Sequence, residues 1–173
     1  MFRKVLFSMF ACLAYAATMQ AQTVISAYIV DNNGEFTNIR NAPNGKIVHK
    51  IPTKATVDFA LMTPRNGWWR IEGDSYSDYD TESEVKLTGS KTGYWIHYSC
   101  VGFCTRNYGG EKMYLRATPS AKGKVLYSFS EPESLLRPVD AKGDWTKVKT
   151  GDGKHEGWIE AVWICSNPVT TCP

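Results

Sequence analysis

The chain has 173 residues and a formal net charge of +3. Lys and Arg never occur in runs longer than two residues, which argues against binding to the phosphate backbone of nucleic acids. After the N-terminal segment no apolar run is long enough for a transmembrane helix, so none is expected there.

The N-terminal segment has the features of a signal peptide. Arg3 and Lys4 precede an apolar run of 13 residues at positions 5–17, which is too short to span a bilayer. We therefore predict a signal peptide at 1–21, cleaved near Ala21, and a periplasmic or secreted protein of nearly neutral charge. The alternative is a lipoprotein in which Cys12 carries the lipid.

The rest of the chain has the pattern of an all-β protein. Short runs rich in β-branched and aromatic residues occur at 24–30, 46–51 and 57–61. Turn-forming sequences separate such runs, at 31–34, 43–45, 65–67 and 142–144. No segment of a dozen residues shows a capped helical period. Short strands in small units favour small barrels over one large sandwich.

Four sequence blocks occur twice in the same order. The first copy has blocks at 39–43 (IRNAP), 45–48 (GKIV), 68–71 (WWRI) and 95–96 (WI). The second copy has them at 115–119 (LRATP), 123–126 (GKVL), 145–148 (WTKV) and 158–159 (WI). Four matched blocks predict a tandem duplication of one small domain. The last two blocks lie closer together in the second copy, so the first copy carries an insertion of about a dozen residues.

These blocks resemble the bacterial SH3 (SH3b) family, in the pattern Asn-Ile-Arg-x-x-Pro, Gly-Lys-Ile-Val, Trp-x-x-Ile/Val and Gly-(Tyr)-Trp-Ile. The resemblance implies a five- or six-stranded SH3-like barrel for each copy. We therefore expect an all-β fold of two tandem SH3-like small barrels, at 22–105 with an acidic insertion at 72–90, and at 106–173. Polar residues and a Gly-Gly pair at 105–110 predict a short hinge and closely placed barrels.

Four cysteines remain if the signal peptide is removed. An even number in an exported protein favours disulfides, and three connectivities are possible. Each pair follows the closing Trp-Ile block of its own copy, which favours Cys100–Cys104 and Cys165–Cys172. Their spacing is loose for a zinc site, so neither a metal nor another cofactor is expected.

No catalytic constellation stands out in the sequence. The three histidines, His49, His97 and His155, occupy positions that belong to the barrels, and no Gly-x-Ser-x-Gly motif occurs. We therefore predict that the protein is not an enzyme. The insertion has acidic residues at every second position, Asp78, Asp80, Glu82 and Glu84. Calcium binding by this loop is therefore an alternative. A ligand-contacting flap is the preferred interpretation of this loop.

The aromatic residues carry the functional prediction. Trp95 and Trp158 match between the copies and are expected to be scaffold residues. The first copy has one extra ring in its third block. Because side chains alternate along a strand, Trp68 points away from the face that Trp69 shares with Ile71. If Ile71 faces the core, Trp68 is exposed.

The predicted ligand-binding residues all lie in the first copy. Tyr94 points away from its scaffold neighbour, and the second copy has a glycine in its place. With Trp68 and the insertion residues Tyr76 and Tyr79, it forms the predicted binding face. The alternative is that these rings bury the contact between the barrels, with Trp163 on the other side.

Together these observations predict an exported, non-catalytic binding module. The resemblance implies that it binds a cell-wall peptide or glycan, or an exported protein, through a shallow aromatic groove. No nucleic acid is expected among its partners, and no membrane span in the mature chain. The alternative is a structural or protein-interaction role in the cell envelope without a small ligand.

Overall fold

The computed structural model describes residues 23–170 and confirms the all-β prediction. The predicted signal peptide and Cys172 lie outside the described residues. Within 23–170 the helical segments are two single-turn 3-10 helices, η1 (Tyr98–Cys100) and η2 (Ala161–Trp163). No helix in this part of the chain has the length and hydropathy needed to cross a membrane.

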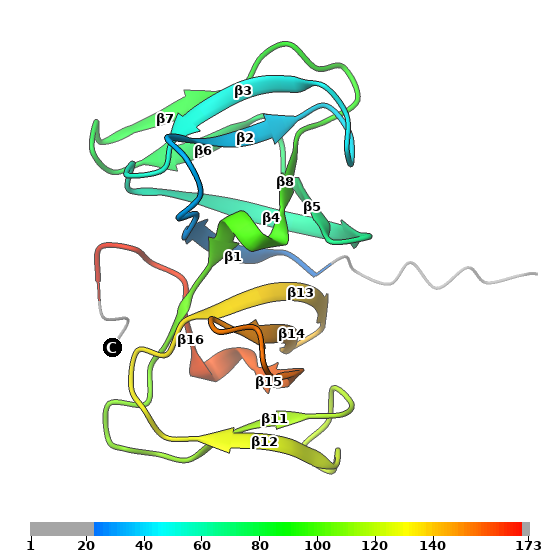
Figure 1. Cartoon of the computed structure of the whole chain (residues 1–173), viewed down its shortest axis with the longest axis vertical. Helices are drawn as coiled ribbons and strands as arrows, with labels where there is room; N and C mark the ends of the chain where they lie inside the picture. The colour runs from blue at the N-terminus through cyan, green and yellow to red at the C-terminus, as the bar shows by residue number, and fades with distance from the viewer. Residues whose placement is uncertain (1–22, 171–173) are drawn as a thin grey trace, which may run out of the picture.

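The protein consists of two lobes, one above the other in Figure 1. Lobe 1, residues 23–102, is built on one antiparallel sheet with the order β3-β2-β8-β5-β4-β1-β9, and the hairpin β6–β7 joins it at β4. Its strands are β1 (Ile25–Ile29), β2 (Phe36–Arg40), β3 (Ile47–Pro52), β4 (Val57–Arg65), β5 (Trp68–Ile71), β6 (Ser75–Asp78), β7 (Ser83–Lys86), β8 (Trp95–His97) and β9 (Val101–Gly102).

Lobe 2, residues 103–170, is built on a five-stranded antiparallel sheet with the order β12-β11-β15-β14-β13. A separate two-stranded sheet pairs β10 with β16. The strands are β10 (Cys104–Thr105), β11 (Met113–Arg116), β12 (Val125–Phe129), β13 (Leu136–Lys142), β14 (Trp145–Thr150), β15 (Glu156–Glu160) and β16 (Ile164–Cys165).

The two lobes share a strand order. The path β3-β2-β8-β5-β4 of lobe 1 corresponds strand for strand to β12-β11-β15-β14-β13 of lobe 2. Both contain a register shift just before an arginine, Arg40 in β2 and Arg116 in β11. In each lobe this arginine donates from Nη1 to a loop carbonyl, that of Gly45 at 2.7 Å or Gly123 at 3.0 Å. The repeated blocks therefore occupy equivalent places in the two sheets.

Strand register also aligns the tryptophans of the third block. Trp68 of β5 lies opposite the last residue of β8, and Trp145 of β14 lies opposite the last residue of β15. Trp68 is thus equivalent to Trp145, and Trp69 is equivalent to Thr146. Trp69 is fully buried on the core side, so it is the extra ring of lobe 1.

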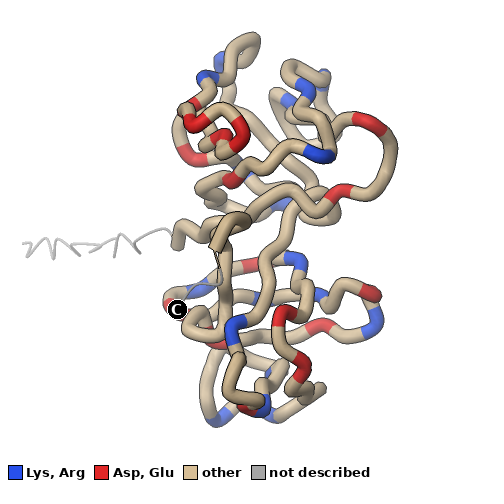
Figure 2. Tube along the Cα trace, turned by 90° about the vertical axis from the view of Figure 1, so that its left-hand side faces the viewer, with Lys and Arg blue, Asp and Glu red and all other residues tan. Residues whose placement is uncertain are grey.

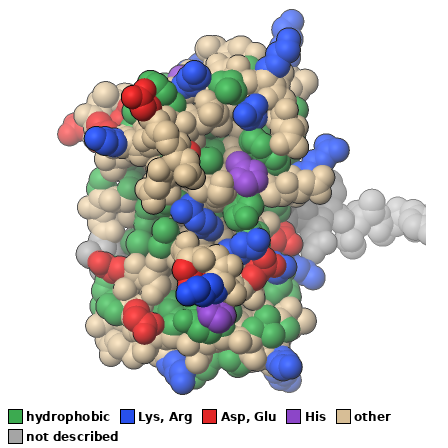
Figure 3. Space-filling model, viewed as in Figure 1, with side chains coloured by type: hydrophobic (Ala, Val, Ile, Leu, Met, Phe, Trp, Pro, Cys, Tyr) green, Lys and Arg blue, Asp and Glu red, His purple; other side chains and the backbone are tan. Residues whose placement is uncertain are grey.

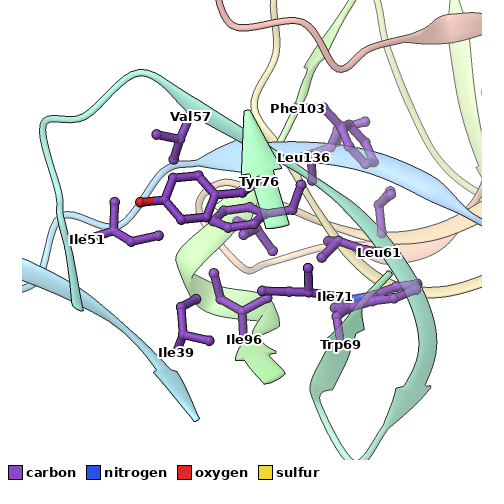
Figure 4. Close-up of a cluster of buried hydrophobic side chains, with 14 of the residues drawn as sticks. Ile39, Ile51, Val57, Leu61, Trp69, Ile71, Tyr76, Ile96, Phe103 and Leu136 are labelled. Atoms are coloured by element: carbon purple, nitrogen blue, oxygen red, sulfur yellow. The ribbon is translucent and has the colours of Figure 1, made fainter. Parts of the chain in front are cut away.

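The core of lobe 1 follows from alternation along its strands, with every second side chain pointing inward. Figure 4 shows this cluster, in which Ile39, Ile71 and Ile96 come from three adjacent strands. Each such side chain contributes about 1.5–3 kcal/mol when it is fully buried. These positions correspond to Leu115, Val148 and Ile159 of lobe 2, which are also fully buried.

The junction between the lobes is tightly bonded. Phe103, which directly follows β9 of lobe 1, and Leu136 of lobe 2 are fully buried and exchange two backbone hydrogen bonds, at 3.0 and 2.9 Å. Across the same junction, Trp69 Nε1 donates to the carbonyl of Pro138 at 2.9 Å. Arg137 donates to backbone carbonyls of lobe 1. The buried residues of both lobes therefore form one continuous cluster.

The segment at 105–110, predicted to be a hinge, is held in place by a buried side chain. Asn107 is fully buried, and its Oδ1 accepts from Thr105 Oγ1. Its Nδ2 donates to the carbonyls of Glu111 and Ser130, at 3.1 and 2.8 Å. These bonds tie the segment to the residues before β11 and after β12 and make it a fixed corner at the start of lobe 2.

The predicted Cys100–Cys104 disulfide is wrong in this structure, because both residues are free thiols. The backbone between them is extended through β9 and β10, which places Cα atoms four residues apart at about 13 Å. A disulfide needs Cα atoms within about 7 Å. Cys104 instead accepts a hydrogen bond from the Tyr28 hydroxyl. The predicted Cys165–Cys172 pair involves a residue outside the described range.

Candidate functional site

A hollow of about 430 Å³ lies on lobe 1 between the end of β2, the start of β5 and helix η1. We call it groove 1. Its lining combines aromatic, amide and charged side chains, among them Phe36, Asn38, Arg40, Asn44, Trp68 and His97. Strands β2, β5 and β8 supply all of these residues except Asn44, which lies in the turn between β2 and β3, so the positions of most are set by the sheet.

Trp68 forms one wall of groove 1 but is more covered than predicted. Its side chain points away from the core, as the alternation requires, yet only 8% of the residue is exposed. Arg40 Cζ lies 5.7 Å from the ring centroid, and the His97 ring meets it edge-on at 5.1 Å. The expectation of a fully exposed ring is therefore wrong, because neighbours on the outer face enclose it.

His97 connects this wall to helix η1. Its Nδ1 accepts from the Ser99 backbone N–H and lies 2.7 Å from Ser99 Oγ, which caps the helix. On its other side the ring lies 4.7 Å from Tyr98. Burial lowers the pKa of His97 below its ordinary value of 6.5, so the neutral form predominates at pH 7.

Two opposite charges line the same groove. Arg40 donates one hydrogen bond to the Gly45 carbonyl. Its guanidinium has further N–H donors. Asp31 is held by two hydrogen bonds, from Asn33 N at 3.0 Å and Thr37 Oγ1 at 3.1 Å. A groove with a fixed cation, a fixed anion and amides suits a polar ligand that carries both acceptors and donors.

The wider surface has no dominant charge. Figure 2 shows basic and acidic residues interspersed along both lobes, and Figure 3 shows the same mixture with hydrophobic side chains on one face. The opposite charges within groove 1 therefore give it its polarity. Its selectivity must come from local geometry, since no long-range field favours one sign of ligand.

Cys100 also lines groove 1, but it is a poor nucleophile. Burial is the largest cause that raises the pKa of its thiol to about 12, and Asp31 acts in the same direction. A nucleophilic cysteine needs a thiolate at working pH. Cys100 is therefore a protonated wall residue.

The three tyrosines predicted to bind ligand lie away from groove 1. Tyr94 is only 4% exposed, and its hydroxyl donates to the Leu87 carbonyl at 3.0 Å. Tyr76 is 7% exposed and packs against Phe59 with ring centroids 5.6 Å apart. Tyr79 is half-buried, and its hydroxyl donates to Asp58 Oδ2 at 3.3 Å. The prediction that these tyrosines form an exposed face with Trp68 is therefore wrong.

The insertion explains this difference. It folds into the ordered hairpin β6–β7, which pairs with β4 and places Tyr76 in the lobe 1 core, as Figure 4 shows. Beyond the hairpin it supplies Leu87, whose carbonyl binds Tyr94. The insertion thus covers Tyr94, which the sequence pattern predicted to be exposed.

The acidic residues of the insertion stabilise its turn. Asp78 Oδ1 accepts from the backbone N–H groups of Asp80 and Thr81, at 3.0 and 3.3 Å. Asp80 Oδ2 accepts from Thr56 N at 2.9 Å, and this hydrogen bond lowers the pKa of Asp80. Over residues 23–170 no three His, Cys, Asp or Glu side chains are grouped so as to hold a metal ion.

Comparison with known proteins gives one family match. Residues 109–164, which include β11 to β15, match the model of the bacterial SH3 domain. Lobe 2 is therefore similar to a bacterial SH3 domain, and the small β units of the structure agree with that class. No curated protein matches the chain.

Two solved structures from Trichomonas vaginalis resemble the chain weakly. NlpC1 shares 11% sequence identity, with a TM-score of 0.30 over 90% of this chain and 50% of its own. NlpC2 shares 10% identity, with a TM-score of 0.31 over 84% of this chain and 48% of its own. The chain thus spans about half the length of these two proteins.

Proposed function

We propose that this protein is an exported, non-catalytic binding module of the cell envelope, which recognises a cell-wall peptide or glycan through groove 1. The observation that carries the proposal is the lining of that groove. One hollow holds a tryptophan wall, a guanidinium, a fixed carboxylate and amide side chains. The bacterial SH3 match of lobe 2 supports assignment to this class of binding module.

The proposed recognition divides between apolar and polar contacts. Phe36 is 43% exposed at the rim and, with the Trp68 edge, offers apolar surface to a sugar ring or a peptide side chain. The free donors of Arg40 suit a ligand carboxylate, for which charge-assisted hydrogen bonds are the strongest option. The volume of groove 1 lies within the range of about 300–1,000 Å³ typical of small-ligand sites.

We further propose that residues 22–105 and 106–173 are two SH3-like barrels derived from one ancestor. The shared strand order supports this, as do the equivalent bulges before Arg40 and Arg116. On this proposal, the insertion and Trp69 are later additions to the first barrel. They strengthen its own core and its contact with lobe 2.

Retention on purified peptidoglycan tests the proposed function. We expect wild-type protein to be retained, and the variant Phe36→Ala/Asn38→Ala to be lost to the wash, because both residues line groove 1. The control is Tyr114→Ala, an exposed aromatic on the equivalent strand of lobe 2. Equal retention of the groove variant and the control would contradict the proposal, provided that both melt like wild type.

A protein partner is the second candidate, and one feature favours it. Strand β12 is an edge strand of lobe 2, with Val125 and Leu126 exposed. An exposed apolar edge can accept a strand from another protein. If Leu126→Lys abolished binding to the cell envelope and the groove 1 variant did not, this candidate would replace the first.

A further inference from the structure

A second hollow lies on lobe 2, beside Trp145, the residue equivalent to Trp68 of groove 1. This hollow, groove 2, has a volume of about 720 Å³ and is lined by Ser120, Asp144, Trp145, Glu160, Ala161 and Val162, with two further loop residues. Each hollow is lined by the loop after the bulged strand, by the first residue of the third-block strand and by a 3-10 helix, but residues of β2 also line groove 1, whereas no residue of β11 lines groove 2. The repeated fold thus places a hollow beside the equivalent tryptophan in each lobe.

The chemistry of the two hollows differs at one equivalent position. Trp145 faces Glu160 across β14 and β15, just as Trp68 faces His97 across β5 and β8. His97 caps helix η1 with its ring, whereas Glu160 precedes η2 and makes no capping hydrogen bond. The Glu160 carboxylate therefore lines groove 2 and does not cap helix η2.

Asp144 supplies a second carboxylate to groove 2, and within the described part of the chain it too has no partner. Across residues 23–170, neither Asp144 nor Glu160 takes part in an ion pair or accepts a side-chain hydrogen bond. Glu156, at the other end of β15, is paired with both Lys147 and Lys149. Lysines thus neutralise Glu156 at one end of β15, while among residues 23–170 the two carboxylates of groove 2 have no such partner.

Apart from Ser120, the rest of the groove 2 lining is apolar. Trp145 is half-buried, so part of its indole is open to the hollow. Val162 is 61% exposed on η2, next to the exposed Ala161. Aliphatic and aromatic surface beside two unpaired carboxylates matches a ligand with an alkyl stem and a cationic head, which an indole face also attracts.

We propose that groove 2 is a binding site for the alkyl-ammonium group of a peptide, such as a lysine-type side chain. The ammonium lies between Asp144 and Glu160, the stem lies along Ala161 and Val162, and Trp145 closes one side. This site does not depend on what groove 1 binds. A ligand that engaged both grooves would gain avidity from the fixed arrangement of the lobes.

An NMR titration of the full exported chain with Nα-acetyl-lysine methylamide tests the proposal. We expect shifts at the Trp145 indole N–H and at the backbone of Ala161 and Val162. The same compound acetylated at Nε keeps the stem but loses the charge. We expect it to bind at least about tenfold more weakly, because the charge-assisted hydrogen bonds are lost. Equal binding of both compounds, shifts confined to groove 1, or no shifts would overturn the proposal.

Charge-neutral variants localise the effect. Asp144→Asn/Glu160→Gln keeps the size of both side chains and should lower affinity about tenfold or more. The matched control is Asp152→Asn, an acid of the same lobe that lies outside groove 2 and should leave affinity unchanged. Unchanged affinity in the double variant, or an equal loss in the control, would contradict the assignment. Both variants are compared at the same salt concentration, since screening weakens such contacts.

Discussion

Two adjacent tryptophans, Trp68 and Trp69, serve different purposes. Trp69 lies in the core and donates a hydrogen bond to Pro138 of lobe 2. Trp68 lies on the opposite face and forms a wall of groove 1 under Arg40. Strand alternation separates the two side chains, and the surroundings of each then decide its role.

Substitution by phenylalanine should distinguish the two rings. Trp69→Phe shrinks a fully buried side chain and leaves the Pro138 carbonyl without its donor, so it should cost about 2 to 4 kcal/mol of unfolding free energy. Trp68→Phe keeps an aromatic ring on the outer face and should cost about 1 kcal/mol. Urea unfolding of both variants measures the difference. Equal losses would contradict the different roles assigned to the two side chains.

The histidines should make stability depend on pH. Burial lowers the pKa of both His49 and His97 below 6.5. As the pH falls through that value the unfolded chain takes up protons that the folded chain does not, so stability present above pH 6.5 is lost on acidification. We expect the Tm to decrease between about pH 7.5 and about pH 5.5.

The variant His49→Gln/His97→Gln tests this cause. It removes both titrating groups and should therefore flatten the pH dependence over this window. Carboxylates with lowered pKa, such as Glu156, lose their contribution only at more acidic pH. If the double variant lost as much Tm as wild type, groups other than these histidines would have to be responsible.

At the scale of elements, the hairpin β6–β7 is a structural addition to lobe 1. It pairs with β4, and it inserts Tyr76 against Phe59 and His49. Its turn is held by Asp78 and Asp80, which accept backbone hydrogen bonds. An acidic, tyrosine-containing loop is thus fixed by the lobe that it covers.

Two tyrosines of the insertion give a matched test of this role. Tyr76→Ala removes a ring from the core and should cost about 3 to 5 kcal/mol. Tyr79→Ala removes a half-buried ring with one hydrogen bond to Asp58 and should cost about 1 kcal/mol. Chemical denaturation of both variants provides the measurement. A small loss for Tyr76→Ala would show that the hairpin is a mobile flap after all.

The strands were predictable from the sequence, but the covering of their outer faces was not. Runs of β-branched and aromatic residues between turn sequences located β1, β3 and β4, and the repeated blocks placed equivalent residues in both sheets. Side-chain periodicity gives the direction of Trp68 and Tyr94 relative to the core. It does not reveal that Arg40 and His97 cover Trp68, or that the Leu87 carbonyl binds Tyr94. Those contacts come from segments far apart in the chain.

The candidate site was likewise only partly predictable from the sequence. Trp68 was found because strand alternation directs it away from the face that Trp69 shares with Ile71. Arg40 and Asn38 lie in the Asn-Ile-Arg block that identified the fold, yet nothing in that block separated groove residues from scaffold. Their role became visible only when the sheet placed β2 beside β8 and η1. When a motif recurs because the fold requires it, the sequence does not show which of its residues also line a binding site.

At the scale of the whole molecule, the two lobes share one buried hydrophobic cluster, which predicts that they unfold together. Phe103 of the connecting segment and Leu136 of β13 pair at the junction, and the buried cluster continues from one lobe into the other. Asn107 fixes the corner that follows. The orientation of groove 1 relative to groove 2 is therefore built into the fold.

A junction variant tests this cooperativity. Phe103→Ala should cost about 3 to 5 kcal/mol and should lower the protection of Ile71 and Val148, one in each lobe, to the same extent in hydrogen exchange. Phe36→Ala removes the same ring from a partly exposed position and should cost about 1 kcal/mol or less. Loss of protection in only one lobe would mean that the lobes unfold independently.

The most direct test of the central proposal is a map of ligand-induced NMR shifts on the wild-type chain, with a soluble peptidoglycan fragment as the probe. Binding at groove 1 predicts that the largest shifts occur at the Trp68 indole N–H and at the backbone of Asn38 and Asn44, which line it. Saturable shifts centred there would support the account. Shifts centred on the β12 edge, or a spectrum that the fragment leaves unchanged, would contradict it.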